Sequence, residues 1–390
     1  MKSVGLITEY NPFHNGHLFH ASLSKQRSET NVTIAIMSGN FVMRGEPAIY
    51  HKFKRTEMAL SAVDLVVELP LIGSLSSSDT FAEIAIKTAQ YLDIDIISFG
   101  SESASLKDLQ YLATQMIAYE THPVFKEKLK QGKSYPRILS ELTHNDTLLQ
   151  SPNNILGISY LKAMQQFAPR MSALTIKREG SLHHQTVIDH HHFASGTSIR
   201  RSLMNDNEDW KNVVPNQIQS LYCTPHTTVE DTFPFIKHQL ITQPKESLHS
   251  IYTINEGFEN RLQTMIHRSD SFESLISNLK TKRYTQTYIQ RVLMNVLLNI
   301  TKDDVNKEIN AVRVLGMSEK GRSYLKYLKA TYPNRHYITN VNQKTAHYFK
   351  NEIKATHVYN LLSNQSLTDF NTPLVLSLIH ISERAGKADR

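Results

Sequence analysis

The sequence of 390 residues is poor in cysteine and tryptophan, with one of each, Cys223 and Trp210. A single thiol excludes an internal disulfide framework and a zinc site made of several cysteines. Long apolar runs are also missing: charge and proline interrupt the most apolar segment, 63–75, well short of the roughly 20 residues of a membrane helix. Glu9 interrupts the N-terminal segment before a secretory signal could form. We therefore expect a cytoplasmic protein without a membrane anchor.

The rest of the composition is typical of a folded protein, with 40% hydrophobic and 20% charged residues. The length suggests two domains. Lys and Arg number 43 against 36 Asp and Glu, which gives a net charge of +7. This excess is compatible with a nucleotide or nucleic-acid partner, but it is too small to identify one.

Apolar runs and amphipathic segments alternate through the first half of the chain. Short β-branched runs predict strands at 4–8, 31–37, 64–70, 94–100 and 173–180, and the segments between them favour helices. This alternation predicts an α/β domain with a mainly parallel, Rossmann-like sheet. Ligands of such sheets bind beyond the carboxyl ends of the strands.

The pattern changes after Asn205. A Thr- and Pro-rich segment, 224–235, is typical of a connection, and residues 255–300 are strongly helical. Two short runs, 310–317 and 336–341, remain candidate strands. We predict two domains, an α/β domain at 1–205 and a mainly helical domain at 206–390.

The most informative segment, YNPFHNGH at 10–17, lies between the first strand and a helix. Gly16 lets a ligand approach the backbone closely. His17 lies near the helix N-terminus, where free N–H groups and the helix dipole favour phosphate. His14 adds a second imidazole, and two imidazoles can stabilise charge that develops on phosphate oxygens. The alternative is two surface histidines beside a turn glycine.

This arrangement of strand, Asn-Pro, HxGH and helix resembles the HIGH-type nucleotidyltransferases, which bind ATP there and direct attack on its α-phosphate. The segment SGTSIR at 195–200 resembles their later Ser/Thr-rich turn, although Gly196 interrupts the usual run. Thr197 can offer hydroxyl and backbone donors, and Arg200 can neutralise phosphate charge. An ordinary helix cap with a surface arginine is the alternative.

Further segments narrow the resemblance to the bacterial tRNA(Met) cytidine acetate ligases. They are SGNFVMRGEPA at 38–48, KFKR at 52–55, AVDLVVELP at 62–70, FGSE at 99–102, PNNILG at 152–157 and TKRYT at 281–285. The resemblance implies that ATP, with Mg²⁺ on its triphosphate, and acetate form acetyl-adenylate. The acetyl group then passes to N4 of the wobble cytidine of elongator tRNA(Met). The resemblance implies no stable protein partner.

The resemblance also assigns site residues. His14 and His17 are the expected catalytic pair, and one asparagine of the pair 153–154 is expected at the nucleotide. The expected ATP-binding residues are Ile7, Thr8, Glu9, Tyr10, Asn11, Pro12, Phe13, His14, Asn15, Gly16, His17, His20, Gly100, Asn153, Asn154, Arg178, Thr197 and Arg200. Arg44, after the second strand, suits an acetate carboxylate or a phosphate, with Asn40 as a polar orienting group.

Basic and aromatic residues alternate from Lys280 to Arg291. Lys282 and Arg283, with Tyr284 and Tyr288, suit phosphates and splayed bases of an RNA, although a solvated charged face is the commoner meaning of such a run. The histidines at 183, 184 and 190–192 match no metal-binding spacing, and we predict no protein-held metal.

Two other functions fit the same residues. A cofactor-type adenylyltransferase would use the same HxGH chemistry on a small phosphate ester, and a non-catalytic RNA-binding protein could retain the nucleotide fold.

Overall fold

The computed structural model describes residues 1–131, 138, 141, 146–149, 151–178, 192–222, 225–255 and 257–377. Cys223 and the histidines at 183, 184, 190 and 191 lie outside these ranges. No helix within them combines the length and the apolarity that crossing a bilayer requires.

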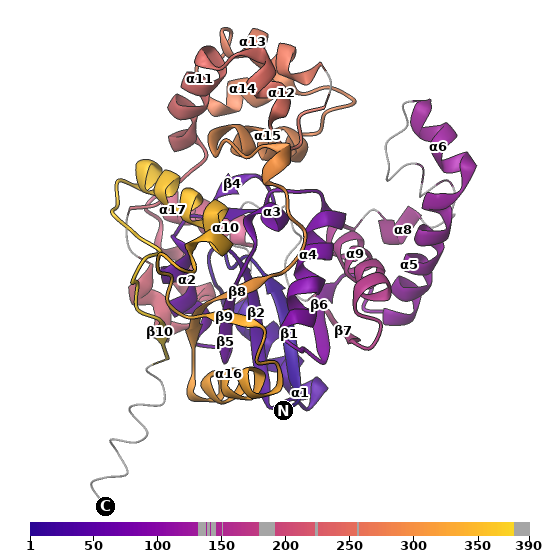
Figure 1. Ribbon diagram of the computed structural model, residues 1–390, viewed down its shortest axis with the longest axis vertical. Helices are drawn as coiled ribbons and strands as arrows, with labels where there is room; N and C mark the ends of the chain where they lie inside the picture. Colours follow the sequence, from indigo (N-terminus) through magenta and orange to yellow (C-terminus); the bar gives the residue numbers. More distant parts are fainter. Residues whose placement is uncertain are drawn as a thin grey trace, which may run out of the picture.

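A twisted sheet of eight strands forms the centre of the molecule (Figure 1). The first half of the chain supplies five parallel strands, in the spatial order β5-β2-β1-β6-β7. They are β1 (Ser3–Thr8), β2 (Val32–Ser38), β5 (Leu65–Leu69), β6 (Ile96–Ser101) and β7 (Ser172–Lys177). The strand order reverses at β1 and β6, and this switch point is where doubly wound sheets bind ligands. The predicted α/β fold with a mainly parallel sheet is confirmed.

Both faces of this sheet are buried. Consecutive residues of a strand point to opposite faces, so each strand contributes apolar side chains to both. In β2, Ile34 and Ile36 join one apolar core, whereas Ala35 and Met37 join the other. The first-half helices are α1 (Asn15–Ser28), α2 (Lys52–Ala59), α3 (Leu71–Ser74), α4 (Ser78–Tyr91), α5 (Leu106–Thr121), α6 (Pro123–Lys130), α8 (Asp146–Leu149), α9 (Pro152–Phe167) and α10 (Gly196–Met204).

A short hairpin lies at the carboxyl end of β2, formed by β3 (Phe41–Val42) and β4 (Glu46–Pro47). It packs on the backbone of α15 (Gln286–Leu297) at Gly45, which has a φ of 77°. A Cβ atom at this position would be 2.3 Å from the Arg291 backbone nitrogen, so only glycine allows the approach. The hairpin therefore joins the sheet to the helical part of the second half.

Helices α11–α15 gather at one end of the molecule, above the hairpin (Figure 1). The remaining second-half elements, residues 311–377, return to the sheet: β8 pairs antiparallel with β5, and β9 and β10 pair with β8. The sheet thus crosses the domain division predicted at 205/206. The elements are α11 (Phe233–Thr242), α12 (Lys245–Ser250), α13 (Phe258–Ile266), α14 (Phe272–Leu279), β8 (Ala311–Met317), α16 (Glu319–Thr331), β9 (His336–Ile338), α17 (Lys350–Ser363) and β10 (Val375–Leu376).

Five 3₁₀ segments complete the described secondary structure. They are Glu208–Val213, Asn216–Leu221, Glu230–Thr232, Lys302–Asp304 and Ala346–Phe349.

Candidate active site

The two histidines of the HNGH segment form the N-terminal cap of α1. His14 is the cap residue, and its Nδ1 accepts the Gly16 N–H at 3.1 Å. The His17 Nδ1 accepts the His14 N–H at 3.3 Å, which closes a reciprocal capping box. The imidazole rings stack with their centroids 3.8 Å apart. The helix start therefore holds the two rings in one fixed arrangement.

These hydrogen bonds also fix which ring nitrogens carry protons. Because each Nδ1 accepts a backbone N–H, the neutral form of either ring carries its proton on Nε2. Burial and, to a smaller extent, the neighbouring Arg178 together lower the pKa of His14 to about 3. Burial, with His14, Arg178 and His20 nearby, holds the pKa of His17 well below its usual range. At neutral pH the site presents two neutral N–H donors.

Aromatic side chains of the same loop support the imidazoles. The rings of Tyr10 and His17 meet edge to face with centroids 4.9 Å apart, and the Phe13 ring lies 5.7 Å from that of His17. Tyr10 and Phe13 are buried, as is Pro12, while Ile7 and Thr8 end β1 directly before this loop. His20, one turn along α1, contacts the Ser98 hydroxyl of β6 through Nε2 at 3.3 Å.

A buried arginine that the sequence analysis did not assign holds this loop to the sheet. Arg55 is fully buried and donates to the carbonyl oxygens of Glu9, at 2.5 Å, and Ser38, at 3.0 Å. The Glu9 carboxylate accepts the Met43 N–H at 2.7 Å, and burial raises its pKa. The predicted ATP-binding residue Glu9 therefore also joins the loop to the hairpin. In the sequence, Arg55 appears only as part of the KFKR segment at 52–55, which gives it no role of its own.

Gly100 and Arg178 lie together at the carboxyl ends of β6 and β7. A Cβ atom at Gly100 would be 3.2 Å from the Arg178 Cγ, so the arginine side chain passes over the glycine. Arg178 donates to the Asn153 Oδ1 at 3.2 Å. Since Arg178 also lowers the pKa of His14, His17 and His20, the structure brings this cation to the imidazole cluster.

The two asparagines at the start of α9 have different surroundings. The Asn154 side chain is buried, and its oxygen accepts the N–H groups of Glu102 and Ser103 at 3.0 and 3.2 Å. Asn153 donates to the Glu102 carboxylate at 2.6 Å and accepts from Arg178. Asn154 thus holds the loop after β6, whereas Asn153 faces the charged groups of the site.

The start of α10 packs against the HNGH loop. Arg200 donates to the Asn11 carbonyl at 2.8 Å and pairs with Glu46 of the hairpin at 3.1 Å. Gly196 permits this approach, since its Cβ would be 3.1 Å from the Asn11 oxygen. Thr197 lies in the first turn of α10, half-buried, and Asn15 donates to the His192 carbonyl at 3.1 Å.

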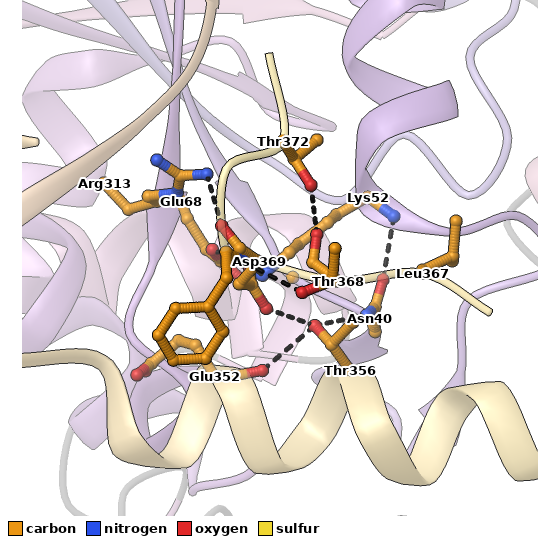
Figure 2. A network of polar contacts seen from close by, with 12 residues as sticks. Asn40, Lys52, Glu68, Arg313, Glu352, Thr356, Leu367, Thr368, Asp369 and Thr372 are labelled. Atoms are coloured by element: carbon orange, nitrogen blue, oxygen red, sulfur yellow. Dashed lines mark hydrogen bonds and ion pairs between the residues drawn. The ribbon is translucent and has the colours of Figure 1, made fainter. Parts of the chain in front are cut away.

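The two residues predicted for acetate, Asn40 and Arg44, have different surroundings. Asn40 is buried, and its amide is used inside the protein, accepting the Lys52 N–H at 2.8 Å and donating to the Thr356 hydroxyl at 3.1 Å. Arg44 lies half-buried in the hairpin turn, close enough to Glu9 to lower its pKa. The Asn40 amide is thus committed to contacts within the protein (Figure 2), and the contact of Arg44 with acetate stays a prediction.

Lys282 and Arg283 are exposed directly before α15, remote in sequence from the imidazole cluster. The Arg283 guanidinium lies 5.4 Å from the centroid of the Tyr284 ring, and Tyr284 stacks on Tyr288 at 5.5 Å. Cations and aromatic rings thus share one surface there. Among the residues that the structure describes, no group of three or more His, Cys, Asp or Glu side chains could hold a metal ion.

The HIGH Nucleotidyl Transferase family model matches residues 1–372. The tRNA(Met) cytidine acetate ligase of Staphylococcus epidermidis is 97% identical over 375 residues, which are 96% of this chain and 100% of that protein. The enzyme of the same name from Staphylococcus aureus is 58% identical and covers 96% of this chain and 99% of its own.

Solved structures of Thermotoga maritima TmcAL are similar over 97% of this chain and 100% of theirs, at 26% identity. The TM-score is 0.88 for the apo form and 0.86 for the form bound with alpha-thio ATP.

Proposed function

Since this chain belongs to the HIGH nucleotidyltransferase family and, within it, to the tRNA(Met) cytidine acetate ligases, we propose how its site carries out that reaction. The enzyme is an ATP-dependent ligase that joins acetate to tRNA(Met). The observation that carries the mechanism is the stacked pair of neutral imidazoles, His14 and His17, at the N-terminus of α1.

The first step forms acetyl-adenylate. An acetate oxygen attacks the α-phosphorus of ATP, the bond from that phosphorus to the bridging oxygen breaks, and pyrophosphate leaves. The Nε2–H groups of His14 and His17 donate to the α-phosphate oxygens as charge grows on them. Arg178 adds a cation at the same place. Because both rings are neutral, they stabilise this charge without a prior proton transfer.

The second step transfers the acetyl group. The N4 amine of the wobble cytidine attacks the acetyl carbonyl, AMP leaves, and the amine loses one proton to solvent. The mixed anhydride is already activated, so the step needs no nucleophilic side chain. Mg²⁺ bound to the triphosphate would supply positive charge that offsets the charge of the phosphate oxygens.

The residues that bind the nucleotide are the loop 7–17, His20, Gly100, Asn153, Arg178, Thr197 and Arg200. Of the asparagine pair, Asn153 contacts the nucleotide, and Asn154 positions the loop after β6. Arg44 pairs with the acetate carboxylate. Asn40 positions the hairpin that carries Arg44 through its contact with the Lys52 backbone. The protein works in the cytoplasm, without a stable protein partner.

The elongator tRNA(Met) binds on the surface around Lys282 and Arg283. Replacing both by Ala removes two phosphate contacts, so tRNA affinity should fall several-fold at low salt, with a shallower salt dependence. The matched control is the double variant Lys326→Ala and Lys329→Ala, which replaces two exposed lysines of α16. Equal affinity of the Lys282/Arg283 variant and wild type in a filter-binding titration would remove this surface from the proposal.

Pyrophosphate–ATP exchange tests the first step. Labelled pyrophosphate should enter ATP only when acetate is present, and not with phosphopantetheine or nicotinamide mononucleotide. His17→Ala should reduce the exchange by about a hundredfold or more, the loss expected for one transition-state donor, while tRNA binding is retained. Exchange that is independent of acetate would contradict the proposal.

A further inference from the structure

The peptide group between Phe13 and His14 is held at both of its edges. Its N–H donates to the His17 Nδ1 at 3.3 Å, within the helix cap. Its carbonyl oxygen accepts the hydroxyl hydrogen of Tyr222, which lies 209 positions further along the chain. This peptide bond is trans, so the group is planar and its N–H and C=O point in opposite directions. The Tyr222 hydroxyl and the His17 ring therefore contact the two edges of one rigid unit.

The aromatic ring of Tyr222 is fixed by its neighbours. It stacks on Trp210, with ring centroids 4.8 Å apart and planes 9° from parallel. The Tyr50 ring meets it edge to face at 5.8 Å. Tyr222 and Phe13 are both buried, so water has little access to the contact between them. Burial raises the pKa of Tyr222, and the nearby Tyr50 adds to the shift. The hydroxyl is thus a rigid donor that keeps its proton near neutral pH.

We propose that Tyr222 is a positioning residue for adenylation, which holds His17 through the Phe13–His14 peptide group so that its Nε2–H points at the α-phosphate. The proposal rests on the function proposed above. Donation from Tyr222 to the carbonyl polarises the peptide group and makes its N–H a better donor to the His17 Nδ1. An Nδ1 that accepts a hydrogen bond leaves the proton of the neutral ring on Nε2. Tyr222 itself does not touch the substrate.

Loss of the Tyr222 hydroxyl leaves the peptide group held at one edge only. Rotation of its plane moves the N–H away from the His17 Nδ1. The ring is then free to turn, or to carry its proton on Nδ1 instead of Nε2. The interaction that suffers is the one that strengthens as charge develops on the phosphate oxygens. Such a loss lowers kcat and leaves the KM for ATP almost unchanged.

The test is acetate-dependent pyrophosphate–ATP exchange of the full-length protein, measured over a range of ATP concentrations. Tyr222→Phe removes only the hydroxyl and keeps the stacked ring. Tyr324→Phe is the matched control, because it also removes a buried tyrosine hydroxyl that contacts backbone carbonyls, those of Leu92 and Asp93 at 2.8 and 2.9 Å. This hydroxyl lies beside Ser3, at the end of β1 opposite the site. Urea unfolding compares the stability of the two variants.

We expect kcat to fall about three- to tenfold in Tyr222→Phe, in line with one lost hydrogen bond, with the KM for ATP within about twofold of wild type. Tyr324→Phe should lose comparable stability and keep the wild-type kcat. Adding Tyr222→Phe to His17→Ala should cause no further loss, because the hydroxyl acts through the His17 ring.

Three results would overturn the proposal: an unchanged kcat in Tyr222→Phe, an equal fall in Tyr324→Phe, or a further fall of the same size when Tyr222→Phe is added to His17→Ala. Nuclear magnetic resonance of the ¹⁵N-histidine-labelled wild type gives a reading that needs no stable Tyr222 variant. The His17 signals, assigned by their absence from His17→Ala, should show a proton on Nε2, and a proton on Nδ1 would also overturn the proposal.

The proposed function fails separately from this inference. Wild type that shows no acetate-dependent exchange would refute the adenylation chemistry. The His17 resonances would still test the chain of contacts from Tyr222 to the ring.

Discussion

Gly45→Ala should be unusually destabilising for an exchange of one hydrogen for a methyl group. The φ of Gly45 is 77°, and a left-handed backbone costs an alanine about 1 kcal/mol. Its Cβ would also be 2.3 Å from the Arg291 nitrogen and 2.4 Å from the Gln290 carbonyl carbon. These are backbone atoms of α15, so they cannot rotate away, and overpacking adds about 1–3 kcal/mol. The expected loss is about 2–4 kcal/mol.

Gly257→Ala separates the two contributions. Gly257 has a φ of 83°, but nothing lies within 4 Å of its Cβ position, so this variant should lose only about 1 kcal/mol. Urea unfolding of both variants, followed by circular dichroism, measures the difference. Gly45→Ala should also raise the acetate KM, because displacement of the hairpin moves Arg44. Equal midpoints for the two variants would refute the close packing of the hairpin on α15.

Two further predictions concern buried charge. Lys52 bridges Glu68, at 2.9 Å, and Asp369, at 2.7 Å, and all three side chains are almost fully buried. Lys52→Met leaves Glu68 and Asp369 without the Lys52 cation and should lower the unfolding free energy by about 3–5 kcal/mol. The loss should be larger at pH 8 than at pH 6, because burial raises the pKa of Glu68 to about 7 even with Lys52 present, so the uncompensated carboxylate is charged mainly at the higher pH. A pH-independent loss in urea melts would contradict this. The pKa of His20 is lowered to about 4 by burial and Arg178, so the unfolded chain takes up its proton first, and wild-type stability should fall as pH drops from 6.5 towards 4. His20→Asn should flatten this dependence in thermal melts, and an unchanged pH profile would count against the buried neutral imidazole.

The strand–HNGH–helix arrangement was predictable because its determinants are local. A short β-branched run defines β1, and His14 and His17 are three residues apart, as a reciprocal helix cap requires. The resemblance to a known family then added Gly100 and Arg178, which the parallel sheet brings to the same edge.

Contacts between distant segments were not predictable in this way. The antiparallel pairing of β8 with β5 joins strands that are far apart in the chain. The residue pattern of a strand does not indicate which other strand it pairs with. The ion pair of Lys52 with Asp369 and the anchoring contacts of Arg55 have the same origin. Asn153 and Asn154 are adjacent in sequence, so the sequence does not distinguish their roles. In the structure, at the start of α9, the Asn154 side chain points to the loop after β6 and the Asn153 side chain to Arg178.

The central claim is that this site activates acetate and that the acetyl group ends on the wobble cytidine of elongator tRNA(Met). Mass spectrometry of nucleosides, after the protein is incubated with ATP, ¹³C-labelled acetate and that tRNA, tests it most directly. The account predicts ¹³C-labelled N4-acetylcytidine with wild type and almost none with His17→Ala. Unlabelled nucleosides with wild type, or equal labelling with His17→Ala, would contradict it.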